Sequence, residues 1–175
     1  MESQLPLRWV FEPKVFFIEL VPRVSNALWR AREGGAVEAM GVMMARQTDV
    51  FVLIGLNDIT SGKKVVSEVV GGVCAIVGEL KRGLRSEQTV VRLLEVPLLP
   101  MFSEGMREEA ANINALLKHL SADAGCTIHG WDQRLLAVDG TVMPQWLIRG
   151  NAGVHLNAQG YDVFARHLRS LIISE

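Results

Sequence analysis

Hydrophobic and polar positions along the chain follow two patterns in turn, one typical of strands and one of helices. Apolar runs rich in β-branched and aromatic residues predict buried strands at 14–21, 49–55, 89–96 and 126–129. Between them, apolar residues recur every three or four positions, as they do on one face of a helix. The clearest such helix ends at Gly83 and has these apolar positions: Val66, Val69, Val70, Val73, Ile76, Val77 and Leu80.

The other helices are predicted from their boundary residues. Pro22 fits the first turn of a helix that Gly34-Gly35 ends, and a short helix at 36–46 follows. Ser103 and Asn157 are expected to be the N-caps of two later helices.

Apolar strands that alternate with amphipathic helices predict a parallel sheet covered on both faces. The expected fold class is therefore α/β: a three-layer α/β/α sandwich with a central parallel sheet, flavodoxin-like in layout. We expect a single domain over 1–175, with 1–12 as an N-terminal extension. In such a fold a binding or catalytic site lies at the carboxyl ends of the strands.

Composition and charge limit the kinds of protein that this chain can be. The chain has 175 residues, 49% of them hydrophobic, which is enough for a core, and a formal net charge of -1. This balance implies no obligatory nucleic-acid or membrane partner. Cys74 and Cys126 are expected to be buried free thiols. The sequence has no apolar run long enough for a transmembrane helix and no signal-peptide pattern, so we expect an intracellular, cytoplasmic protein. We also expect no metal and no cofactor.

Gly55-Leu56-Asn57-Asp58 directly follows the second predicted strand and opens a predicted polar turn over 57–62. The side-chain amide of Asn57 can donate a hydrogen bond to an oxyanion that develops during a reaction. The alternative is an Asx-type turn after the strand.

The segment from Gly153 to Tyr161 leads into the C-terminal helix and contains His155. A histidine placed just before a helix, over the strand ends, suits general-base work on a hydroxyl nucleophile. The alternative is a solvated or capping histidine.

In this order the two segments resemble the sequence blocks of the SGNH-hydrolase superfamily, the GDSL-like esterases and lipases. Gly55 to Asp58 matches the G-x-N-D block in full, and Gly153 to Tyr161 matches the D-G-V-H-L-N…G-Y block except at its first residue. Gly35 lies where the family has its second-block glycine. The resemblance implies the SGNH fold, with Asn57 and Gly35 at oxyanion positions and His155 at the position of the base.

Two positions depart from the family's catalytic pattern. The nucleophilic serine would stand at the end of the first strand, where this sequence has Val21. The acid would stand three residues before His155, where this sequence has Ala152. Loss of such an acid costs a serine protease ~10⁴-fold in turnover. Ser25 is a candidate nucleophile only if the site is displaced, and Asp139 is far along the chain from the missing acid.

These departures lead us to expect a pseudo-enzyme whose fold serves as a binding or scaffolding module, for a protein or for RNA. The pattern of loss is similar to that in the SGNH-like OSK domain of Oskar, which binds RNA. Arg23, Arg30 and Arg32 are the candidate RNA contacts.

Two other interpretations stay open. The first is a carboxylic-ester or acetyl-ester hydrolase of the SGNH type with an altered active site. The second is that Asn57, Asp58 and His155 are structural, with Asp58 capping the turn that follows it and His155 anchoring the last helix.

Overall fold

A parallel sheet forms the centre of the molecule. The computed structural model describes residues 15–19, 24–32, 48–62, 65–83, 89–148 and 155–173. The described strands lie side by side in chain order, and all their pairings are parallel. They are β1 (Val15–Glu19), β2 (Thr48–Leu53), β3 (Thr89–Leu94) and β4 (Thr127–His129). Each matches a predicted strand to within a few residues.

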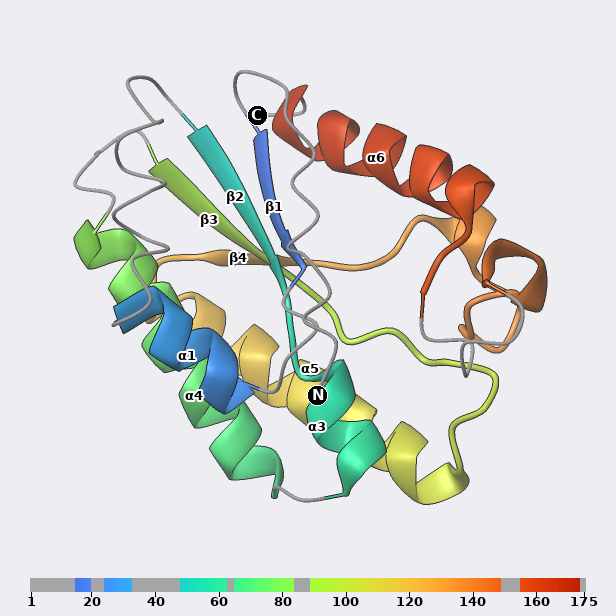
Figure 1. The fold of residues 1–175 in the computed structure, drawn as a ribbon, viewed down its shortest axis with the longest axis horizontal. Helices are drawn as coiled ribbons and strands as arrows, with labels where there is room; N and C mark the ends of the chain where they lie inside the picture. The colour runs from blue at the N-terminus through green and yellow to red at the C-terminus, as the bar shows by residue number, and fades with distance from the viewer. Residues whose placement is uncertain are drawn as a thin grey trace, which may run out of the picture.

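Helices cover the sheet on both faces. Figure 1 shows α1, α4 and α5 on one side of the sheet and α6 on the other. The described helices are α1 (Val24–Arg32), α3 (Leu56–Ser61), α4 (Val66–Gly83), α5 (Glu104–Ser121) and α6 (Ala158–Ile173). The predicted three-layer α/β/α sandwich is therefore confirmed. Residues 33–47, which contain Gly34-Gly35 and the predicted helix 36–46, lie outside the described residues.

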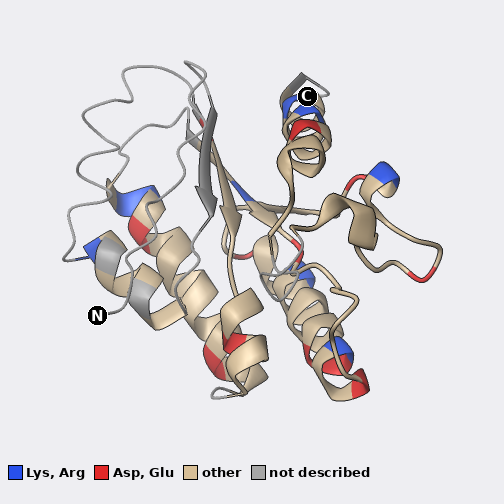
Figure 2. Ribbon diagram, turned by 45° about the vertical axis from the view of Figure 1, so that its right-hand side comes forward, with Lys and Arg blue, Asp and Glu red and all other residues tan. Residues whose placement is uncertain are grey.

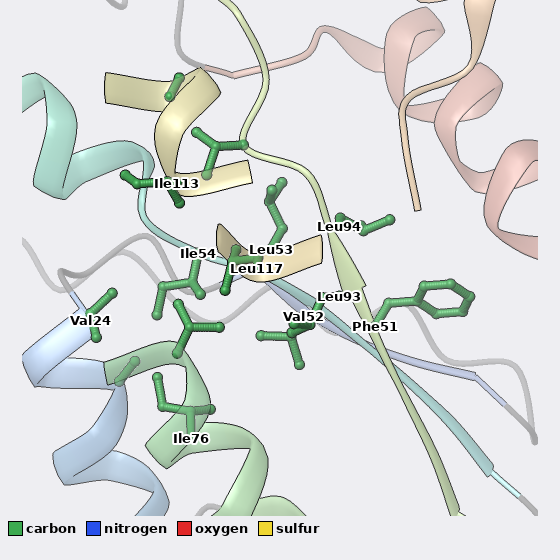
Figure 3. Packing of buried hydrophobic residues seen from close by; sticks show 14 of the residues in the cluster. Val24, Phe51, Val52, Leu53, Ile54, Ile76, Leu93, Leu94, Ile113 and Leu117 are labelled. Carbon is green, nitrogen blue, oxygen red and sulfur yellow. The ribbon is translucent and has the colours of Figure 1, made fainter. Parts of the chain in front are cut away.

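Both faces of the sheet are buried at β2 and β3, which explains the near-continuous apolar runs in these strands. In β2, Val52 points toward Ile76 of α4, whereas Phe51 points to the opposite face (Figure 3). Phe51 and Val52 are both at most 1% exposed. Apolar side chains are thus required at successive positions, instead of at every second position as in a half-exposed sheet.

The helices α1 and α4 pack unusually closely at Gly72. A Cβ atom built at Gly72 would lie 2.0 Å from Cγ1 of Val24, well inside van der Waals contact. Glycine at this position therefore allows the first turn of α1 to pack directly on α4.

Both predicted N-caps are present. The hydroxyl of Ser103 accepts a hydrogen bond from the Met106 amide at 3.3 Å, at the start of α5. The side-chain oxygen of Asn157 accepts one from the Gly160 amide at 2.9 Å, at the start of α6. Each cap satisfies an amide that the helix itself leaves without a partner.

The prediction of a polar turn over 57–62 was wrong, because α3 occupies this segment. The helix is bounded by Gly55 and Gly62, both with positive φ, 107° and 58°. Its polar side chains bond to its own backbone: Ser61 Oγ donates to the carbonyl of Asp58 at 3.0 Å. A helix this short and polar has no apolar period that a sequence pattern can reveal.

Candidate functional site

The two segments singled out in the sequence lie at the carboxyl edge of the sheet. Asn57 is in the first turn of α3, directly after β2, and His155 lies just before α6. Their chain neighbours Leu56 and Leu156 line one and the same pocket. The fold thus brings together segments about a hundred residues apart, as expected for a site at the strand ends.

This pocket is apolar and lies between the sheet and the start of α6. Its cavity volume is about 30 Å³, and the wider hollow of about 390 Å³ includes open solvent. Tyr161 is the one lining residue with a hydroxyl, and no lining residue carries a charge. The lining residues are Leu53, Leu56, Pro97, Leu99, Trp131, Val142, Leu147, Leu156, Tyr161 and Phe164.

Aromatic rings form one wall of the pocket. The ring of Trp131 stacks on that of Phe164 in α6, with centroids 4.9 Å apart. Its indole Nε1 donates to the carbonyl of Glu95 at 2.8 Å, which ties the ring to the end of β3. Trp146 is also partly buried against the core, whereas Trp29 on α1 is 56% exposed.

Asp58 links α3 to α1 and is buried, with 1% exposure. Its Oδ2 accepts a hydrogen bond from the Val24 amide at 2.9 Å, at the first residue of α1. The expectation that Asp58 caps the following turn was therefore wrong: its carboxylate caps a helix that precedes it in the chain. A carboxylate at this end of a helix is favoured by the helix dipole as well as by the hydrogen bond.

The side chain of Asn114 in α5 likewise bonds to backbone groups, here just after the end of β3. Its side-chain oxygen accepts from the Val96 amide at 2.8 Å, and its side-chain nitrogen donates to the Val96 carbonyl at 3.0 Å. The two bonds extend the strand's hydrogen bonding beyond its end and hold the chain where it enters the pocket at Pro97.

Three of the predicted candidate residues, Ser25, Arg32 and Asp139, do not line the pocket. Ser25 is exposed on α1. Arg32 is exposed at the end of α1, and its Nε lies 2.5 Å from Oε1 of Glu79 on α4. Asp139 accepts hydrogen bonds from the amide and hydroxyl of Thr141, at 3.0 and 2.6 Å, so its carboxylate is held in its own turn. Val21, Arg23, Gly35, Ala152 and the side chain of Arg30 lie outside the described residues.

An acid–histidine pair that the sequence analysis did not find joins α6 to the segment after β4. Nδ1 of His167 lies 3.8 Å from Oδ2 of Asp132, and its Nε2 is 2.9 Å from the carbonyl of Gly130. Asp132 also binds Arg134, which lowers the pKa of its carboxyl to about 2 through side-chain hydrogen bonds. No motif joins positions 132 and 167; only the fold brings them together.

Lowering the pH should therefore reduce the stabilisation that Asp132 provides to the folded state. A carboxyl with a lowered pKa stabilises the folded state above its unfolded pKa of about 4, and this stabilisation is lost as the pH falls toward 2. We expect Asp132→Asn to lower the thermal midpoint at pH 6 but to match the wild type near pH 2. Asp162→Asn, at an exposed position of α6, is the control. A deficit that persists unchanged at pH 2 would contradict the assignment.

The cysteines are free, as predicted, but only Cys126 is buried, since Cys74 is half-buried. Burial raises the pKa of both thiols, so neither is activated as a nucleophile. Within the described residues, no three histidine, cysteine or acidic side chains are grouped as metal ligands. No described helix combines the length and apolar character needed to span a bilayer.

Several solved structures share this architecture. A GDSL-like lipase from Bacteroides thetaiotaomicron matches with a TM-score of 0.66 and 17% identity, over 87% of this chain and 72% of that one. A member of the lipolytic G-D-S-L family from Veillonella parvula matches with a TM-score of 0.60 and 18% identity, over 83% and 72%. The chain has an SGNH-hydrolase-like fold. The OSK domain of Drosophila Oskar matches as well, with a TM-score of 0.54 and 15% identity, over 78% and 70%.

No family model matches the chain, and no curated protein sequence matches it. The expectation of an SGNH-like fold, which was based on two short blocks, is confirmed by structure. The roles of Asn57, Gly35 and His155 as oxyanion and base positions stay predictions.

Proposed function

We propose that this chain is a non-hydrolytic binding module built on the SGNH-hydrolase-like fold, and that the apolar pocket at the carboxyl edge receives an apolar group of a protein partner. Two observations support this role: the connection between β1 and α1 has no hydroxyl or thiol, and the pocket is apolar and uncharged.

The connection between β1 and α1 carries the non-hydrolytic part of this proposal. The strand ends at Glu19 and the helix begins at Val24, and the residues between them are Leu20, Val21, Pro22 and Arg23. None of these side chains has a hydroxyl or thiol that can attack an ester. Ala152, three residues before His155, provides no acid to orient the imidazole.

The pocket supports binding of an apolar group. Its walls are hydrophobic and aromatic, its lining is uncharged, and burying apolar surface in such a cavity drives association. RNA recognition instead needs cationic side chains for phosphates. The lining of the pocket has no cationic side chain, which favours a protein partner over RNA as its ligand.

An altered SGNH-type esterase is the second candidate. It is favoured by Asn57 and His155, whose segments border the same pocket. Under this alternative Ser25, or another hydroxyl, has to reach the imidazole of His155.

Binding of a neutral apolar fluorophore tests the pocket. N-phenyl-1-naphthylamine should bind saturably, and Leu56→Glu should weaken its affinity at least about tenfold, since an apolar ligand then faces a charge it cannot pair. Leu116→Glu, at an exposed position of α5 away from the pocket, is the matched control and should bind as the wild type does. Equal affinities for all three proteins, or no saturable binding, would contradict the proposal.

A further inference from the structure

Trp131, which forms an aromatic wall of the pocket, has a chain neighbour on each side that contacts the same histidine. Nε2 of His167 in α6 lies 2.9 Å from the carbonyl oxygen of Gly130, and its Nδ1 lies 3.8 Å from Oδ2 of Asp132. The ring of Trp131 itself stacks on Phe164, which is one turn before His167 in α6. α6 therefore holds this wall of the pocket through its ring and through the residues on either side of it.

A neutral imidazole cannot satisfy both partners of His167. A carbonyl oxygen only accepts hydrogen bonds, so the bond to Gly130 requires a proton on Nε2. In a neutral imidazole Nδ1 then has no proton, and its lone pair faces the negative carboxylate of Asp132. A protonated imidazole has a proton on each nitrogen and a positive charge, so it makes both contacts favourably. The complete set of contacts therefore requires the protonated form of His167.

The surroundings of Asp132 keep its carboxylate charged. Arg134 binds its two oxygens at 3.0 and 2.6 Å, and these hydrogen bonds lower the pKa of the carboxyl to about 2. Figure 2 shows an acidic and a basic residue side by side in the segment that follows β4. The side chains of His167 and Asp132 are only 17% and 11% exposed, so solvent screens their interaction less than it would at an open surface. His167 thus faces a constant negative charge.

The other titratable side chains around this segment have partners of their own. Glu95, at the end of β3, pairs with Lys118 of α5. Nε2 of His129 lies 2.8 Å from the hydroxyl of Thr127 in β4. The positions one turn away from His167 on α6 are uncharged: Val163, Phe164, Ser170 and Leu171. Among the described residues, Asp132 is therefore the charged partner of His167.

We propose that His167 is a positioning residue of the pocket: its protonated form fixes Trp131, and loss of the proton loosens this wall and weakens binding of an apolar ligand. This inference rests on the binding role proposed above and adds a pH dependence to it. Neither His167 nor Asp132 lines the pocket, so both act through Trp131. Because histidine ordinarily changes charge between about pH 5 and pH 8, affinity should be higher at the acidic end of this range.

Titration with N-phenyl-1-naphthylamine at about pH 5.5 and about pH 8, where this probe is uncharged, tests the proposal. The wild type should bind about threefold more weakly at the higher pH, the effect expected for an ion pair near the surface. His167→Gln can still donate to the Gly130 carbonyl but carries no charge, so its affinity should be the same at both pH values. Asp132→Asn should also lose the pH dependence. His119→Gln, at an exposed position of α5, is the matched control and should keep the threefold difference.

The indole N–H of Trp131 provides a measurement that needs no ligand. Its resonance in ¹H–¹⁵N spectra, assigned by its absence in Trp131→Phe, should shift between the same two pH values in the wild type and much less in His167→Gln. A pH dependence of affinity that persists in His167→Gln, or a wild-type affinity that is the same at both pH values, would overturn the role of His167. If the resonance shifts as expected but the probe never binds saturably, His167 still fixes Trp131, and the proposed binding role of the pocket is what fails.

Discussion

Asp49→Ala should lower the free energy of unfolding by about 3–5 kcal/mol, because it removes one partner of a buried ion pair. Asp49 is 4% exposed and Arg92 is 2% exposed, and Oδ1 of Asp49 lies 2.6 Å from Nε of Arg92. The pair lies on the face of the sheet toward α6, since Arg92 is in register with Phe51 and its guanidinium is 6.0 Å from that ring. Urea unfolding followed by circular dichroism measures the change.

A double variant distinguishes the destabilisation caused by an unpaired buried charge from the stabilisation that the ion pair itself provides. Asp49→Ala combined with Arg92→Met should be more stable than Asp49→Ala alone, because no buried charge then loses its partner. Lys118→Ala breaks the exposed ion pair with Glu95 and should cost about 1 kcal/mol or less. An Asp49→Ala variant as stable as Lys118→Ala would show that the buried pair has little influence on the fold.

Gly160→Ala should destabilise the protein by about 1–3 kcal/mol, as expected for overpacking. A Cβ at position 160 would lie 2.8 Å from the backbone oxygen of Trp146 and 3.2 Å from Cβ of Leu156. Backbone cannot move aside as a flexible side chain can, so the start of α6 must shift. Because Leu156 lines the pocket, the same shift should weaken binding of the apolar fluorophore.

Gly105→Ala is the matched control for Gly160→Ala, since both residues lie in the first turn of a helix. An added Cβ at Gly105 meets nothing within 4 Å, so stability should be unchanged or slightly raised. A Gly160→Ala variant that unfolds like this control would contradict the close approach of α6 to Trp146.

The regular elements could be predicted because their sequences follow a period. The apolar positions of α4 recur every three or four residues, and the strands are apolar over successive positions. Ser103 and Asn157 could be identified as caps because capping depends on local chemistry. α3 was missed because a helix this short has no period to detect, and the Thr60 and Ser61 hydroxyls that bond to its backbone are typical of turns as well.

The long-range polar contacts could not be predicted. Asp58 bonds to the amide of Val24, and Arg92 pairs with Asp49; in each case the partner is defined only once strands and helices are placed beside each other. A charged residue within an apolar strand has the same local pattern whether it faces solvent or a buried partner. The position of the pocket, in contrast, could be predicted. The segment with Asn57 follows β2 and the segment with His155 precedes α6, and both lie at the carboxyl edge of the sheet.

We propose that the chain has an SGNH-hydrolase-like fold without hydrolytic activity. Hydrolysis of p-nitrophenyl acetate by the purified protein tests it most directly, with His155→Ala and Ser25→Ala beside it and Ser67→Ala, at an exposed position of α4, as the matched control. We predict the same slow background rate for all four proteins, because the proposed binding module has no nucleophile positioned to attack an ester. Clear turnover by the wild type that disappears in His155→Ala and persists in Ser67→Ala would contradict the claim and establish an esterase.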